Sequence, residues 1–318
     1  MIVQKLKYLM WIPIAILIVG LIVGFANGGL NLGIDFTGGS LTTYDIGEEF
    51  DTETVLSAVK AAGIEDAQVV KSGDNWQSAV VRTQDIGESE LQAEVNARVL
   101  DNIKGTYPNA VISSEDRVGA TTSGDLVFSA FLSVLVACGL MLIYIWIRFE
   151  LWSGIASVVA LLHDVGIMTA VMAIVQMSIN SSYIAACLTI VGYSINNTIV
   201  LLDRLRDNKN TLPKGQYSYE ELGNMSIKAS LGRTINTTIT TLIMVIALYV
   251  LGVDTIKEFT LPIIIGLIAG TFSSIFLAVP MTIYMEKAAD KRKALQGTKK
   301  KAKKKIAKKT KKSGKKKK

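Results

Sequence analysis

Six long runs of apolar residues divide the chain. Each is close to the roughly 20 residues that a helix needs to cross a bilayer. Polar and apolar residues alternate with shorter periods elsewhere, most clearly between the first and second runs. The pattern therefore predicts a polytopic α-helical membrane protein with a bundle of six transmembrane helices. The expected spans are residues 8–26, 126–147, 151–177, 183–202, 235–252 and 261–285.

Residues 28–123 have the pattern of a small folded domain. Strand-type and helix-type segments follow one another in the order βαββαβ, with Gly, Asp and Asn at the turns. This order is typical of a ferredoxin-like α+β domain, in which two helices cover one face of the sheet. The expected strands are residues 40–46, 67–71, 77–83 and 110–116, and the expected helices are 52–62 and 89–103.

Charge is distributed unevenly along the chain. The formal net charge is +7, yet residues 286–318 carry 18 basic and 2 acidic side chains, whereas residues 28–123 carry 16 acidic and 6 basic. A lysine-rich run with few apolar residues cannot build a core, so we expect a disordered tail. Its charge fits anionic lipids or ribosomal RNA, and equally a solvated topology anchor. The expected divisions are a first helix at 1–27, the α+β domain at 28–123, a five-helix membrane region at 124–285 and the tail at 286–318.

The loops between the spans predict the orientation. Basic residues collect before the first span, at Arg148, between the fourth and fifth spans and in the tail, while the opposite short loops contain only Lys257. Because positive loops stay in the cytoplasm, we expect both termini there and the α+β domain outside. The first apolar run is too long for a signal peptide and lacks a small-x-small cleavage site, so it is expected to be a retained helix.

Polar residues near the middle of the third span need an explanation, because polar groups in hydrocarbon are costly. A carboxylate at Asp164 must be paired, hydrated or protonated. His163 fits a proton relay and a structural hydrogen bond equally well. For Asp164 we favour a functional or interhelical polar role.

The fourth span contains GYSINNTIVLLDRLRDN at residues 192–208. Polar residues recur there at spacings of three and four, so they are expected to share one helix face. The face comprises Tyr193, Asn196, Asn197, Val200 and Arg204, with Ser194 and Thr198 beside it, and Asp203 begins a charged turn that follows.

The fifth span is preceded by a polar segment. Ser218 and Glu221 have the Ser-x-x-Glu capping spacing, which predicts a short amphipathic helix in the loop. Arg233 and Thr234 then open a run rich in threonine. Threonines in membrane helices often bond only their own backbone, and an arginine at a helix start can simply reach toward the interface.

Four separated motifs resemble the SecF subunits of the SecD/SecF family of protein-export membrane proteins, within the resistance-nodulation-division superfamily. They occur in order on separate segments, and the resemblance covers nearly everything up to about residue 285. The motifs are GIDFTGGS at 33–40, LLHDVGI at 161–167, GYSINNTIVLLDRLRDN at 192–208 and LGRTINTTITTL at 231–242.

This resemblance implies an accessory subunit of the Sec translocase in the bacterial cytoplasmic membrane. With SecD, it would use an ion gradient to promote export and release of secreted polypeptides beside the SecYEG channel, and indirectly with SecA. In that family the position of Asn197 is usually an aspartate of the ion pathway, and Arg233 matches the arginine that accompanies it. Asp35, Gly38 and Gly39 are expected at the junction of the external domain. We expect no cofactor and no metal site.

Asn197 departs from the family pattern, because an amide is neutral and cannot carry a proton. Four explanations are open: coupling through another carboxylate, with Asp164 the best candidate; a titrating site mainly in SecD; sodium binding helped by Asn197; or a bundle that serves as a scaffold. We favour the second, since one subunit of a two-part bundle can lose an acid that its partner retains.

Other functions compete with ion-driven export. Half of a small-molecule or lipid exporter is supported by fold analogy alone. A passive scaffold of the translocon would need no ion flux. An enzyme is not expected, because the sequence shows no nucleophile-base pair and its one histidine lies in a membrane span.

Overall fold

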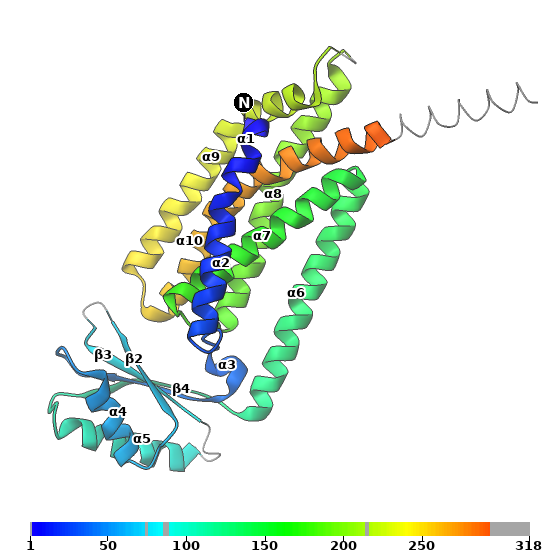
Figure 1. The fold of residues 1–318 in the computed structure, drawn as a ribbon. Helices are drawn as coiled ribbons and strands as arrows, with labels where there is room; N and C mark the ends of the chain where they lie inside the picture. Colours follow the sequence, from blue (N-terminus) through cyan, green and yellow to red (C-terminus); the bar gives the residue numbers. More distant parts are fainter. Residues whose placement is uncertain (1, 74–75, 85–88, 214–215, 293–318) are drawn as a thin grey trace, which may run out of the picture.

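A helical bundle carries a small α+β unit at one end (Figure 1). The computed structural model describes residues 2–73, 76–84, 89–213 and 216–292. Within them, five helices are long and apolar enough to cross a membrane, and the helix Trp11–Ala26 is apolar but shorter. The architecture is therefore that of a polytopic helical membrane protein with one small sheet.

The segment from Ile2 to Ala26, which includes the first apolar run, forms two helices that meet at Met10. Pro13 lacks the N–H that would bond the carbonyl of Leu9, which explains a break at this point. The bundle comprises α1 (Ile2–Leu9), α2 (Trp11–Ala26), α6 (Ala120–Arg148), α7 (Leu151–Val175), α8 (Ser181–Thr211), α9 (Tyr219–Leu251) and α10 (Asp254–Ser273), followed by a π-helical turn η1 (Ser274–Ala278) and further α-helix at 279–292.

Small residues bring α2 against α7. A Cβ atom built on Gly20 would lie 2.5 Å from Cβ and 2.7 Å from Cα of Ala170, and one on Gly24 would lie 3.8 Å from Cβ of Ala173. The spacing Gly20-x-x-x-Gly24 is the small-residue pattern that lets membrane helices approach closely. The hydrophobic pattern alone does not reveal this contact.

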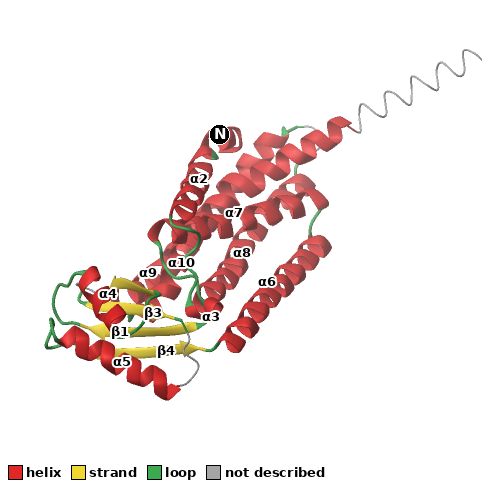
Figure 2. Cartoon of the chain, turned by 60° about the horizontal axis from the view of Figure 1, so that its bottom comes forward, coloured by secondary structure: helices red, strands yellow, loops and turns green. Residues whose placement is uncertain are grey.

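The α+β unit is inserted between α2 and α6. Its antiparallel sheet has the strand order β2-β3-β1-β4, and α4 and α5 cover one face (Figure 2). Tyr44 and Val81 point to that face and are buried with Val99 of α5. The elements are α3 (Ile34–Thr37), β1 (Gly39–Asp45), α4 (Thr52–Ala61), β2 (Ala67–Ser72), β3 (Ser78–Thr83), α5 (Ser89–Lys104) and β4 (Val111–Val118).

The expected strands and helices of this unit are confirmed to within two residues, and α3 is an addition. Burial alternates strictly along β3, which is the pattern of a strand with one face in a core. The sequence alternation was therefore a reliable signal here.

The helices of the bundle extend beyond the apolar runs, which corrects two expectations. The charged segment after the fourth span is helical rather than a turn, since α8 continues to Thr211 and Asp203 pairs with Arg148 at 3.2 Å. The cap at Ser218 is confirmed as a full capping box with Glu221. It opens the continuous 33-residue α9, however, so a separate short helix is wrong.

The expected disorder from residue 286 is wrong for its first part. Residues 286–292 are helical, and the carboxylate of Glu286 is buried and pairs with Lys209. The remaining tail, residues 293–318, lies outside the described residues. Its interaction with lipids or ribosomes stays a prediction.

Candidate functional site

Asp164 is the centre of a polar cluster inside the bundle. Its side chain is 0 % exposed. Oδ2 accepts hydrogen bonds from Ser194 Oγ of α8 at 2.5 Å and from Ser273 Oγ of α10 at 2.9 Å, and Oδ1 lies 2.9 Å from Nδ1 of His163. A buried carboxylate is stable only with such partners. Asp164 therefore links three helices.

The last helix approaches this carboxylate through a glycine and a wide turn. A Cβ atom on Gly270 would lie 3.1 Å from Cβ of Ser194 and 3.5 Å from Oδ2 of Asp164. The π-helical turn begins at Ser274, whose Oγ lies 2.9 Å from Oγ1 of Thr198. Single π turns inside α-helices are frequent at functional sites. Ser273, at the end of α10, and Ser274, at the start of η1, thus contribute to the same polar cluster.

Next to the cluster around Asp164, a chain of hydroxyl groups connects α8, α9 and α10. The hydroxyl of Tyr193 donates to Thr238 Oγ1 at 3.4 Å, and Thr238 Oγ1 lies 2.8 Å from Thr271 Oγ1. Thr238 also donates to the carbonyl of Thr234, as membrane threonines commonly do. These contacts place polar groups at one level of all three helices.

Two buried polar atoms one turn away have no hydrogen-bond partner among the described residues: Nδ2 of Asn197 and Oγ1 of Thr234. These residues are 4 % and 2 % exposed. Asn197 follows Tyr193 by four positions on α8, and Thr234 precedes Thr238 by four on the antiparallel α9, so both lie at the same level. Because buried polar groups normally have partners, this level is suited to a water molecule that accepts from Asn197.

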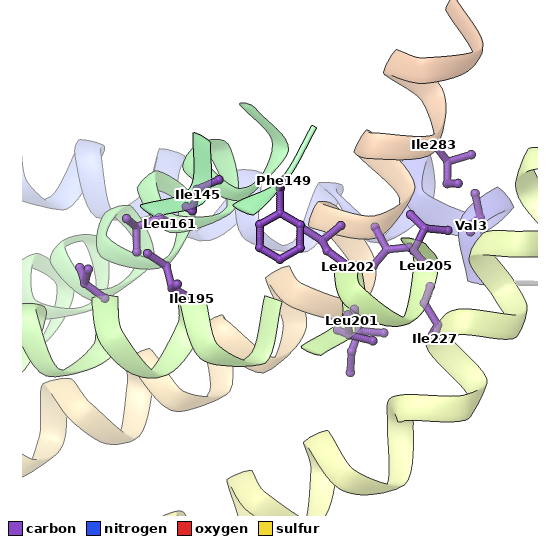
Figure 3. Close-up of a cluster of buried hydrophobic side chains, with 13 residues drawn as sticks. Val3, Ile145, Phe149, Leu161, Ile195, Leu201, Leu202, Leu205, Ile227 and Ile283 are labelled. Carbon is purple, nitrogen blue, oxygen red and sulfur yellow. The ribbon is translucent and has the colours of Figure 1, made fainter. Parts of the chain in front are cut away.

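A hydrophobic layer separates these polar groups from the far end of the bundle. Figure 3 shows Leu201, Leu202 and Leu205 of α8 gathered with Ile227 of α9, and all four are at most 2 % exposed. Beyond the layer lies the ion pair of Lys209 and Glu286. This apolar layer therefore lies between the polar groups on its two sides.

The residues singled out on α8 and α9 do not form one buried face. Asn197 is buried, whereas Asn196 and Arg204 are exposed. Arg233 is exposed as well, while its neighbour Thr234 is buried. Their spacing of three and four places them on one side of the continuous α8, and only part of that side is buried.

The buried cluster instead contains Ser194 and Thr198, which were placed beside that face, together with two serines of the last helix, Ser273 and Ser274, that the sequence reasoning missed. The signal for these serines is weak, because they lie in an apolar helix with only Gly270 and Thr271 nearby.

The expected junction residues lie where the chain passes from the bundle into the sheet, and Asp35 contacts the bundle directly. Asp35 Oδ2 accepts a hydrogen bond from the backbone N–H of Ser181, where α8 begins. Gly38 and Gly39 have φ of 70° and 124°, and a Cβ on Gly39 would lie 2.4 Å from the carbonyl oxygen of Thr83. Glycine is required at such a turn.

Two family models match the chain. The family model of the protein export membrane proteins SecD/SecF, C-terminal part, matches residues 98–288, and the SecD/SecF GG motif matches residues 23–44. The chain belongs to the SecD/SecF family. The matched regions include Asp164, Asn197 and the junction glycines.

Two SecF proteins are similar to this chain over most of their length. The SecF of Acidaminococcus fermentans is 37 % identical over 90 % of this chain and 97 % of its own. The SecF of Cereibacter sphaeroides is 34 % identical over 87 % of both chains. This SecD/SecF member is thus a multi-pass protein of the bacterial membrane and an accessory subunit of the Sec protein translocase.

Solved SecDF structures share the fold. The crystal structure of SecDF, a translocon-associated membrane protein from Thermus thermophilus, superposes with a TM-score of 0.80 at 30 % identity, covering 90 % of this chain and 38 % of that one. A super-membrane-facing form of SecDF gives a TM-score of 0.63 at 29 % identity over 94 % of this chain and 40 % of that one. This chain therefore corresponds to part of a longer SecDF chain, which supports association with SecD.

Proposed function

We propose that this subunit, together with SecD, uses an ion gradient across the cytoplasmic membrane to promote the release of exported polypeptides. The SecYEG channel and, indirectly, SecA would be its neighbours. The observation that carries this proposal is Asp164, a fully buried carboxylate whose oxygens contact α8 and α10 while it belongs to α7. A change of proton or ion occupancy there would alter the packing of three helices at once.

The membrane arrangement proposed here has six spans. Residues Ile2–Ala26 of α1 and α2 would together reach about 37 Å at 1.5 Å per residue, enough to cross a bilayer. Both described ends of the chain lie at the end of the bundle away from the sheet (Figure 1). This supports two cytoplasmic termini and an external unit at 28–123. The strand order β2-β3-β1-β4 supports a ferredoxin-like unit.

Of the four explanations for Asn197, the burial and bonding of Asp164 support coupling through that carboxylate. Asn197 and Thr234 would then line the path on the cytoplasmic side, and the layer at Leu201, Leu205 and Ile227 would close it. The exposed Arg233 is available to a partner such as SecD. A titrating site in SecD is compatible with this arrangement.

Depletion of the subunit tests the function as a whole. We expect exported proteins to be released more slowly after they cross, with unchanged susceptibility to small toxic compounds. Pulse-labelling with protease accessibility at the outer surface measures the release. Normal export combined with accumulation of such compounds would instead support the exporter alternative.

Substituting Asn197→Asp tests the pathway. We expect it to be tolerated and to change the pH or sodium dependence of release, because it adds a titratable group at a buried level. The neighbouring and exposed Asn196→Asp is the matched control and should leave that dependence unchanged. If the two variants show the same pH and sodium dependence of release, Asn197 is not part of the ion pathway.

A further inference from the structure

The α+β unit is joined to the loop between α7 and α8 by backbone hydrogen bonds. Gly33 N–H donates to the carbonyl of Ile179 at 2.8 Å, and Ile179 N–H donates to the carbonyl of Asn31 at 2.7 Å, around a parallel bridge between Leu32 and Ile179. A Cβ atom on Gly33 would lie 2.8 Å from Cβ of Asn180, so the approach requires glycine. This joint holds the linker before the sheet, not the sheet itself.

A side chain of the sheet adds a separate contact to the same place. Arg82 lies on β3, on the face opposite the helices, because its neighbours Val81 and Thr83 are buried on the helical side. Its Nη1 donates to Oδ1 of Asn31 at 2.8 Å and to the carbonyl of Leu32 at 3.0 Å. Its Nη2 donates to Oγ of Ser178 in the α7–α8 loop at 3.4 Å.

The Arg82 contact is incomplete, unlike the backbone joint. A guanidinium has five N–H donors. Its three acceptors here are neutral, and Nε is buried without a partner among the described residues. Burial lowers the pKa of Arg82, while the charge of Glu258 opposes this change. A half-buried cation whose hydrogen-bond acceptors are all neutral contributes only a modest net stability, so the contact can open at a small cost in free energy.

Space and backbone freedom for movement lie next to this contact. A cavity of about 520 Å³ separates the open face of the sheet from the bundle and is lined on one side by Leu41 and Thr43 and on the other by Asn180 and Glu258. Gly38, and Gly39 at the start of β1, have positive φ angles and connect the backbone joint to the sheet. A pivot there would move the sheet without breaking the joint.

We propose that Arg82 is a positioning residue that latches the α+β unit onto the α7–α8 loop, and that its release lets the unit pivot at Gly38 and Gly39. The loop connects the helix of Asp164 with the helix of Ser194, so movement between these helices reaches the latch through Ser178. Only this last link, from ion handling to the external unit, rests on the proposed function.

The latch is tested by a distance measurement on the full chain in lipid bilayers. Spin labels are placed at the exposed positions Lys60 of α4 and Val250 of α9, after Cys138 and Cys187 are replaced by alanine. Arg82→Gln is expected to raise the ratio of separated to docked molecules roughly tenfold, the effect of losing about one hydrogen bond to a charged group.

Two further variants make the result specific. Arg98→Gln removes an exposed ion pair with Glu94 within α5 and should leave the distances unchanged. Ser178→Ala removes an acceptor on the bundle side without altering the sheet, and it should shift the distances in the same direction as Arg82→Gln by a smaller amount.

An unchanged distribution in both Arg82→Gln and Ser178→Ala overturns the latch, and so does an equal shift in Arg98→Gln. This measurement needs no exported substrate, so its failure is distinct from failure of the proposed function, which the depletion experiment decides.

Discussion

Replacing Asp164 by asparagine is expected to remove the ion-gradient-dependent part of protein release while the subunit still inserts in the membrane. The amide has nearly the same shape but cannot take up or lose a proton or carry charge. Its NH2 group would also face hydroxyls that now donate to the carboxylate, at a stability loss of about 1–3 kcal/mol. The measurement is release of a translocated reporter from membrane vesicles with and without proton and sodium gradients.

The control for this substitution is Asp207→Asn, which makes the same chemical change at an exposed position of α8. It should respond to the gradients like the unaltered chain. If Asp164→Asn also keeps a full response to both gradients, Asp164 is a structural residue and the bundle is a scaffold or relies on SecD.

Enlarging Gly20 to leucine is expected to have the largest effect on stability. The new side chain would meet Cβ and backbone atoms of Ala170 at distances no contact tolerates, so α2 must move away from α7. Overpacking of this kind commonly costs about 1–3 kcal/mol, and more when backbone must shift. The expected result is a lower Tm of the detergent-solubilised subunit and weaker co-purification with SecD.

Gly139→Leu is the matched control in a bundle helix, since no atom lies within 4 Å of a Cβ atom built there on α6. It should leave the Tm unchanged. Equal losses in the two variants would show that added bulk in any helix, rather than the α2–α7 contact, is responsible.

The α+β unit was predictable because its signals are local. Alternation along strands such as Ser78–Thr83 and glycines at turns act within a few residues. The helix ends were less predictable, because hydropathy marks only the part of a helix that lies in hydrocarbon. The capping box at Ser218 and the pair of Asp203 with Arg148 extend helices into water, and the second of these depends on packing.

The candidate site was predictable only where polarity was conspicuous. An acid in an apolar run singled out Asp164, and the amide run singled out Asn197. Ser273 was missed because serines in such helices usually bond their own backbone, and its contact with Asp164 joins residues 109 positions apart. Which of the adjacent Asn196 and Asn197 is buried depends on where α9 and α10 lie, which spacing on α8 alone does not determine.

The π-helical turn has a consequence for the phase of the last helix. Buried positions recur there at a constant interval of four, at Gly266, Gly270, Ser274, Ala278, Thr282 and Glu286. Four residues exceed one α-helical turn of 3.6, so in a regular helix such a series would rotate steadily around the axis. The wider turn at Ser274–Ala278 offsets part of this rotation. One side of a single helix can therefore face the interior both at Asp164 and at the ion pair with Lys209, and deleting one residue from the turn would rotate the two halves out of register.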